Sequence, residues 1–425
     1  MDPQQGHQGA TATSKPPIED NGRIPIYSPE FAADPHGHYR QMRIDYGSGD
    51  AAAPGPGLVP VEIWPGVPAT LVINYATAVR ILNDPSHFPA DPSVWQRTVP
   101  ADIPIMPMVE YRPNAIRTSG AEHARYRRAI ADALAGIDHN TVRSMVERSA
   151  VPVVNTFCED GRADVLSQYA FPLVFSVFCQ TLGCPPEIGE RVAAAIAGMF
   201  DGVDTATVNA QMGEALLDLT ALKRAQPGDD VTTRLVQHPA ELTDEEMVHQ
   251  LVLLFAAGVE PPLNLIANTL LLMLTDSRFT STVQGIPLPT STAIDERLTT
   301  DPPMANYCIT YPPQPTLIEG VWLPAHQPVI ISMAACNTDP DLSSHTAGDN
   351  RWNLAFSSGP HACPAHARPF GTLLAREVID QLLDYLPETK LAVPAKDLVW
   401  RPGPFHRALT ALPVVFPPSR PFPIL

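Results

Sequence analysis

The sequence predicts a mainly α-helical protein with small β-sheets, an α+β fold in which helices fill the middle of the chain. Apolar residues recur with a 3.6-residue spacing almost without interruption from about residue 122 to 277, as in amphipathic helices. Short alternating stretches bounded by Pro and Gly, the pattern of strands, occur only before and after that region. With 44% hydrophobic and 17% charged residues, the chain can bury a core, which excludes wholesale disorder.

The N-terminal part is expected to begin with a disordered segment, residues 1–22, which is polar and rich in Gln, Thr and Pro. The remainder, 23–425, is expected to form a single domain. Residues 88–115 are Pro-rich and aperiodic, and a stretch of this length predicts a functional loop rather than a connector. The elements expected before that loop are helices at 34–46 and 75–82 and strands at 59–64 and 70–73.

Pro and Gly residues separate the helical segments that follow. The longest segment begins at Thr243, which forms a capping box with Glu246, and runs to Leu274. Residues 286–355 are irregular and Pro-rich. The other predicted helices are 122–134, 140–158, 165–182, 186–200, 206–224 and 365–385, and strand-like stretches lie at 316–322, 329–333 and 411–416.

Charge and composition exclude several classes of protein. The 28 Lys and Arg residues against 45 Asp and Glu give a net charge of −17, which disfavours nucleic acids and anionic membranes as partners. The N-terminus has no apolar signal region, and the most apolar stretch, 251–274, is interrupted by Glu260, Pro261 and Pro262. Six cysteines without a CxxC pair indicate free thiols. We therefore expect a cytoplasmic protein.

One segment carries distinctive chemistry, the run Phe356-Ser-Ser-Gly-Pro-His-Ala-Cys363-Pro-Ala-His. It predicts a turn that ends on Cys363 at the N-terminus of the 365–385 helix, where the helix dipole favours a thiolate. Three alternatives follow. Cys363 is a buried structural residue, or it binds zinc together with His361 and His366, or it is the axial thiolate of a haem iron, a ligand that favours O–O cleavage.

The same segment resembles the cysteine loop of the cytochrome P-450 superfamily, F-x-x-G-x-H-x-C-x-G. Phe356, Gly359, His361 and Cys363 match this pattern, and Ala365 replaces its last glycine. The resemblance implies that Cys363 binds the iron of one haem b (iron protoporphyrin IX) per chain. It also implies that Phe356, Gly359 and Ala365 contact the haem, and that His361 binds a propionate.

Two further motifs extend the resemblance over about residues 25–420. His123 and Arg127 match H-x-x-x-R, whose members share one helix face and bind propionates in the family. Ala257, Gly258 and Glu260 match the A-G-x-[DE]-T stretch of the long helix on the distal side of the haem. The resemblance implies a triangular prism with the haem between that helix and the cysteine loop with the final helix.

The distal motif departs from the family pattern at its last position. Pro261 replaces the threonine that is thought to relay protons, and Pro262 follows it. Two prolines remove the N–H donors for two carbonyls of the preceding turn, so we expect a kink in the helix. Glu260 remains as a carboxylate able to organise water or a substrate N–H, with Asn264 one turn away.

The E-x-x-R motif of the family also fails. Thr299 replaces the arginine that would follow Glu296, and Arg297 lies about 100° away around the helix. No Lys or Arg occurs from there to Arg351, which is therefore the expected partner of Glu296. The arginine that the family places near Thr310, where it binds a propionate, is missing too.

The resemblance implies a monooxygenase that oxidises a small apolar or aromatic molecule in bacterial specialised metabolism. Electrons are expected from a ferredoxin with its reductase, docking on the basic run 112–128, and no nucleic acid or membrane is expected to bind. One alternative is oxidative C–C or C–N coupling of aromatic or indole-containing cyclic dipeptides, suggested by Pro261. Another is a haem-binding protein with little turnover, and the remotest is a zinc or catalytic-thiol protein.

Overall fold

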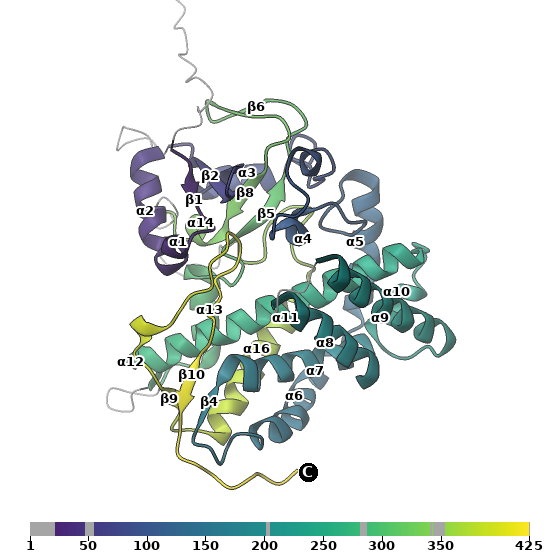
Figure 1. Ribbon diagram of the computed structural model, residues 1–425, viewed down its shortest axis with the longest axis vertical. Coiled ribbons are helices and arrows are strands. Elements are labelled where there is room, and N and C mark those ends of the chain that lie inside the picture. Colours follow the sequence, from purple (N-terminus) through teal and green to yellow (C-terminus); the bar gives the residue numbers. More distant parts are fainter. Residues whose placement is uncertain are drawn as a thin grey trace, which may run out of the picture.

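The computed structural model describes residues 22–46, 55–200, 205–280, 287–340, 342 and 353–424. The disordered segment predicted at 1–22 therefore lies outside the described residues except for Gly22, and so does Arg351. One half of the molecule is built on a sheet and the other on packed helices, as Figure 1 shows.

Five strands from both parts of the chain form the main sheet, in the order β1-β2-β3-β8-β5. The predicted pair 59–64 and 70–73 is the antiparallel hairpin β2-β3, joined at Pro65-Gly66. Strand β8 pairs in parallel with β3, and β5 lies antiparallel on its outer side. This pairing brings the region before the cysteine loop beside the N-terminal hairpin. The strands are β1 (Ile24–Pro25), β2 (Leu58–Trp64), β3 (Val67–Val72), β5 (Asn306–Thr310) and β8 (Val329–Ser332).

The predicted single strand at 316–322 is instead a two-stranded hairpin. Strands β6 (Thr316–Ile318) and β7 (Val321–Leu323) pair antiparallel, and the two residues between them, Glu319 and Gly320, both have positive φ. A two-residue turn of this kind matches the twist of the strands that it joins. A third sheet, ordered β4-β10-β9, contains the strand predicted at 411–416; its members are β4 (Arg162–Asp164), β9 (Lys390–Leu391) and β10 (Pro413–Val415).

Short helices surround the main sheet, and some of them were not predicted from the sequence. The predicted helix at 34–46 forms as α2, whereas α1, which ends just before it at Ala33, was not predicted. The stretch 286–355, predicted to be irregular, contains a helix of eleven residues, α13. The loop 88–115 is irregular apart from single turns. The helices of this half are α1 (Pro29–Ala33), α2 (Pro35–Tyr46), α3 (Tyr75–Leu82), η1 (Trp95–Thr98), α4 (Met106–Val109), α13 (Thr290–Thr300) and α14 (Met333–Asn337).

The helical half follows the predicted order closely. The segment 165–182, predicted as one helix, is a π-helix, η2 (Val165–Ala170), followed by α7 (Phe171–Leu182), and Pro172 lies in the first turn of α7. The change of helix type occurs where proline cannot donate a backbone bond. The other helices are α5 (Gly120–Ala135), α6 (His139–Val154), α8 (Pro186–Phe200), α9 (Thr205–Ala225), α10 (Val231–Val236), α11 (Asp244–Thr275), α12 (Ser277–Thr280) and α16 (Ala367–Tyr385).

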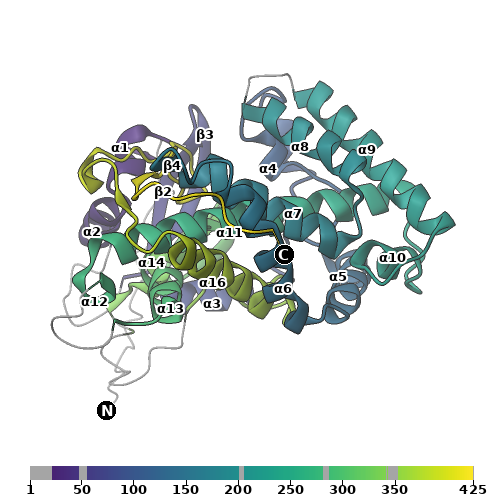
Figure 2. The same ribbon diagram turned by 90° about the horizontal axis from the view of Figure 1, so that it is seen from below.

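Helix α11 is the central element of the molecule and crosses it from side to side (Figures 1 and 2). The capping box of Thr243 and Glu246 forms as predicted. The helix contacts α7, α9, α13 and α16 and continues as one element through Pro261 and Pro262. Two stretches, Val165–Leu182 and Asp244–Thr275, are long and apolar enough to cross a membrane, but half of each window is buried inside the protein, as in core helices of globular proteins. The cytoplasmic location stays a prediction.

Candidate functional site

The cysteine loop is held by a tight set of backbone bonds. The Cys363 N–H donates to the Phe356 carbonyl at 2.9 Å, and the Ala362 N–H donates to the Gly359 carbonyl at 3.1 Å. Gly359 has a φ of 70°, and a Cβ at this position would overlap with the carbonyl oxygen of Leu82. Glycine is therefore required both by the backbone conformation and by the close approach of α3. The match of Gly359 to the family pattern has a direct steric reason.

The expected helix N-terminus is not where Cys363 lies. Helix α16 begins at Ala367, with His366 as its N-cap, so the thiol precedes the first turn by four residues and the dipole, which acts within that turn, adds little. Burial raises the pKa of the Cys363 thiol, while the charges of Arg368 and Arg127 lower it in part. The nearby cations, rather than the helix end, are the groups that favour a thiolate here.

Helix α5 brings the H-x-x-x-R side chains to this loop. The rings of His123 and His361 stack with centroids 3.9 Å apart. Within the described part of the chain, His123 Nε2 and His361 Nδ1 are buried without a hydrogen-bond partner. Arg127 is close enough to Cys363 for the two to interact electrostatically, and its guanidinium makes no ion pair with a described residue. Three unpaired polar groups therefore gather beside the cysteine.

The middle of α11 carries the distal motif, and the packing of the helix against its neighbours is interrupted there. Ala256 and Ala257 are exposed, although Phe255 and Val259 on either side are buried and the helix crosses the middle of the molecule (Figure 1). Gly258 is different, because a Cβ on it would overlap with the ring of Phe178 on α7. This glycine lets α7 and α11 pack closely, and the accessible turn belongs to the alanines.

Glu260 is not a free carboxylate. Arg401 and Asn264 both donate to its Oε1, the latter at 3.1 Å. Burial acts to raise the pKa of the carboxyl group, but the charges of Arg401 and His406 and the two hydrogen bonds outweigh it and lower the pKa. Asn264 was expected from its i+4 spacing, whereas Arg401 was missed because it is 141 residues away.

The expected pairing of Glu296 with Arg351 lies outside the described residues, and within them Glu296 has a partner that was not predicted. Arg278 Nη2 donates to both carboxylate oxygens of Glu296 at 2.9 Å. Arg278 lies in α12, two residues after Asp276, the C-cap of α11, and the packing of α11 against α13 brings it there. Because Arg278 precedes Glu296 in the chain, a search of the following residues could not find it.

A buried ion pair lies at the C-terminal end of α13. Asp301 accepts from Arg407 Nε at 3.1 Å and contacts His36 Nε2 at 3.3 Å. Arg407 also donates to the Ala32 carbonyl. This pair links α1, α13 and the C-terminal segment.

Another arginine that the sequence analysis counted as surface charge is buried. Arg117 is 4% exposed, donates through Nη2 to the hydroxyl of Tyr307 and lies over its ring. Fewer charges of the run 112–128 are therefore available for docking, because Arg125 also pairs with Glu246 and Arg112 pairs with Glu110. Among the five arginines of that run, only Arg128 is exposed.

The residues around Cys363 fit a haem better than a zinc ion. Among the described residues no group of three or more His, Cys, Asp or Glu side chains is placed to hold a metal, so the zinc alternative has no support. The guanidinium of Arg127 supplies a positive charge, and the unpaired nitrogens of the buried imidazoles of His123 and His361 lie in the same cluster, which is suited to carboxylates. Haem carries two propionates, and these groups would satisfy the unpaired donors.

Comparison with known proteins gives the same picture. No family model matches the chain. The chain is 28% identical over 431 residues to the cytochrome P-450 monooxygenase PikC of Streptomyces venezuelae, covering 96% of each. It is 28% identical to vitamin D(3) 25-hydroxylase of Pseudonocardia autotrophica, covering 92% of this chain and 96% of the hydroxylase. The solved structure of CYP154C4 from a Streptomyces species superposes with a TM-score of 0.80 at 27% identity, over 95% and 100% of the two chains. The expected fold is confirmed.

Proposed function

We propose that this chain, which belongs to the cytochrome P-450 superfamily, is a monooxygenase that oxidises a small apolar or aromatic molecule in bacterial specialised metabolism. The observation that carries this proposal is the unpaired donor cluster of His123, Arg127 and His361 beside the half-buried Cys363. A haem bound through this thiolate would supply the cleavage of dioxygen.

The protein residues have separate tasks in this proposal. Cys363 would hold the iron, and the charges of Arg368 and Arg127 partly oppose the burial that raises the pKa of its thiol. His123, Arg127 and His361 bind the propionates. The exposed turn at Ala256 and Ala257 leaves room beside α11 for the substrate.

Apolar and aromatic side chains next to that turn support an apolar substrate. Phe255 on α11 meets Phe175 and Phe178 of α7 with ring centroids 6.0 and 5.7 Å apart. Aromatic rings of this kind offer dispersion contacts and few hydrogen bonds to a molecule that lies beside them. One relative is named for hydroxylating vitamin D(3), itself a largely apolar molecule, which agrees with this substrate class.

Glu260 is assigned the role of a fixed hydrogen-bond acceptor. Its lowered pKa and its bonds to Arg401 and Asn264 keep it ionised, so it accepts from water or from a substrate N–H rather than donating a proton. A ferredoxin with its reductase is proposed as the electron source. The charges left for its docking are Arg128 and the half-buried Arg368.

A second reaction type, oxidative coupling of aromatic or indole-containing cyclic dipeptides, is favoured by one observation. Pro261 offers neither a hydroxyl nor an N–H at the position next to Glu260, so proton delivery at this turn falls to water or to the substrate. A low-turnover haem-binding protein is the remaining alternative. Product analysis separates the three, since it distinguishes a hydroxylated product, a coupled product and no product.

The proposal is tested by the spectrum of the reduced carbon monoxide complex together with turnover. We expect the purified protein to be red and to give the long-wavelength band that is the hallmark of the superfamily. Cys363→Ala should lose that band, whereas Cys158→Ala, at a buried cysteine packed between other elements, should keep it. A colourless protein after haem supplementation, or an unchanged band in Cys363→Ala, would overturn haem-thiolate ligation. Turnover of a panel of apolar metabolites with a surrogate ferredoxin then decides between the reactions.

A further inference from the structure

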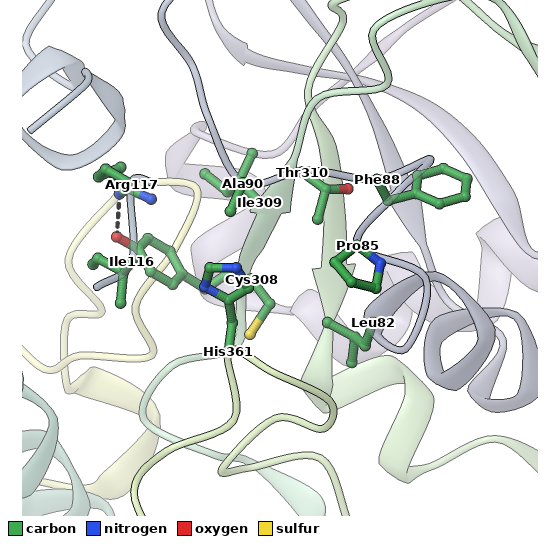
Figure 3. A pocket seen from close by; sticks show the side chains of 11 residues that line it. Leu82, Pro85, Phe88, Ala90, Ile116, Arg117, Cys308, Ile309, Thr310 and His361 are labelled. Atoms are coloured by element: carbon green, nitrogen blue, oxygen red, sulfur yellow. Dashed lines mark hydrogen bonds between the residues drawn. The ribbon is translucent and has the colours of Figure 1, made fainter. Parts of the chain in front are cut away.

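A small cavity separates the cysteine loop from the sheet half of the molecule, and Figure 3 shows the side chains around it. Its volume is 60 Å³, which leaves room for a carboxylate group with water. Most of the lining is apolar, from α3, the loop after it and β5. The polar lining side chains are Arg117, Tyr307, Cys308, Thr310 and His361.

Arg117 brings a full positive charge to this cavity without a negative partner. It is 4% exposed, and within the described residues it forms no ion pair with a carboxylate. Its side-chain partner is the hydroxyl of Tyr307, which donates its own proton to the Met108 carbonyl at 3.1 Å. The Tyr307 hydroxyl therefore offers Arg117 a hydrogen-bond acceptor and not a carboxylate. A buried charge without a counterion is costly, so the site favours an anion.

Two further polar atoms in the same cavity lack partners. Thr310 Oγ1 and His361 Nδ1 are both buried without a hydrogen-bond partner among the described residues. They come from β5 and from the cysteine loop, whereas Arg117 comes from the loop before α5. Three elements therefore present a cation, a hydroxyl able to donate a hydrogen bond and an unpaired imidazole nitrogen to one enclosed space, a composition suited to a carboxylate.

We propose that Arg117 binds a propionate of the haem in this cavity, supported by Thr310 and His361. It would take the place of the arginine that is missing at Thr310, contributing the same charge from a different element. Tyr307 then acts as a positioning residue, because its hydroxyl and ring fix the guanidinium. This inference depends on the haem binding of the proposed function.

The test compares Arg117→Gln with Arg128→Gln in the holoenzyme. Arg128 is an exposed arginine of α5 and serves as the matched control. The propionate bending bands in the resonance Raman spectrum should shift in Arg117→Gln and stay in place in Arg128→Gln. Transfer of haem to a scavenging apoprotein should be faster by about tenfold or more in Arg117→Gln only, because a charge-assisted hydrogen bond is lost.

Unchanged propionate bands in Arg117→Gln would overturn the proposal, while the Soret spectrum reports separately on Cys363. Should Arg117→Gln not accumulate as holoprotein, Arg117→Lys decides. Lysine keeps the charge but not the planar fork, so its propionate bands should shift with a smaller gain in transfer rate. Wild-type bands in Arg117→Lys would then count against the assignment.

Discussion

Arg401 in the C-terminal segment donates a hydrogen bond to the carboxylate of Glu260 in the middle of α11. The pair connects the last part of the chain to the turn of the helix that carries the distal motif. Burial alone would raise the pKa of Glu260, and the charge of Arg401 is the largest of the contributions that lower it. The neighbouring imidazole of His406 is buried, and burial lowers its pKa to about 4.

The first prediction concerns the pH dependence of stability in Arg401→Gln. A carboxyl group with a depressed pKa contributes stability that is present above its unfolded pKa and is lost as the pH falls through the folded value. Arg401→Gln removes that contribution, so the variant should melt below the wild type at neutral pH. The difference should persist down to about pH 4, near the ordinary pKa of a Glu carboxyl, and shrink as the pH falls below it. Melting curves across this range, with the exposed Arg420→Gln as control, measure it. Parallel pH profiles of variant and wild type would contradict the assignment.

The second prediction contrasts two acidic residues of the α13 region. Asp301→Asn leaves the guanidinium of Arg407 buried without its counterion, and breaking a buried pair from one side costs about 3–5 kcal/mol. Glu296→Gln only loosens a half-exposed pair with Arg278, so its unfolding midpoint should stay close to that of the wild type. Denaturant unfolding of both holoproteins makes the comparison. Equal losses in the two variants would show that Glu296 retains the structural task that we assign to Asp301.

Local patterns in the sequence predicted the helices and the cysteine loop, because helix periodicity, capping and turn geometry depend on neighbouring residues. The capping box of Thr243 and the turn at Gly359 are of this kind. The partners of the charged residues could not be predicted in the same way. Arg278, Arg401 and Arg407 reach their carboxylates only after helices and the C-terminal segment have packed together, and no spacing rule encodes such contacts.

The burial of individual charged residues was the second property that could not be predicted from the sequence. Arg117 lies in a run of arginines that reads as a basic surface, yet it is enclosed between the loop before α5 and β5. Charge counted along a chain does not distinguish a solvated arginine from a buried one, because the two differ only in the tertiary environment. The docking surface expected at 112–128 is smaller for this reason.

The third prediction concerns two glycines close to the cysteine. Gly359→Ala forces a side chain into a left-handed backbone and against the Leu82 carbonyl, so the cysteine loop must shift. We expect a loss of haem content and a weakened carbon monoxide band. Gly371→Ala in α16 meets no neighbouring atoms and should stabilise the helix by about 0.5–1 kcal/mol. Haem content and melting temperature measure both variants. Full haem occupancy in Gly359→Ala would show that the loop tolerates the displacement.

The last prediction separates the two consequences of Pro261. Pro261→Ala restores a backbone N–H to α11 without a hydroxyl, and Pro261→Thr restores both. Both variants should raise the melting temperature, because proline in a helix interior is about 3 kcal/mol less favourable than alanine, with the smaller rise in the β-branched threonine. Only Pro261→Thr should change the ratio of substrate product to hydrogen peroxide per NADPH consumed, since only its hydroxyl can hold water beside Glu260. The same ratio in both variants would mean that the missing hydroxyl does not govern proton delivery, and that the substrate or Glu260 with its bound water already performs this task.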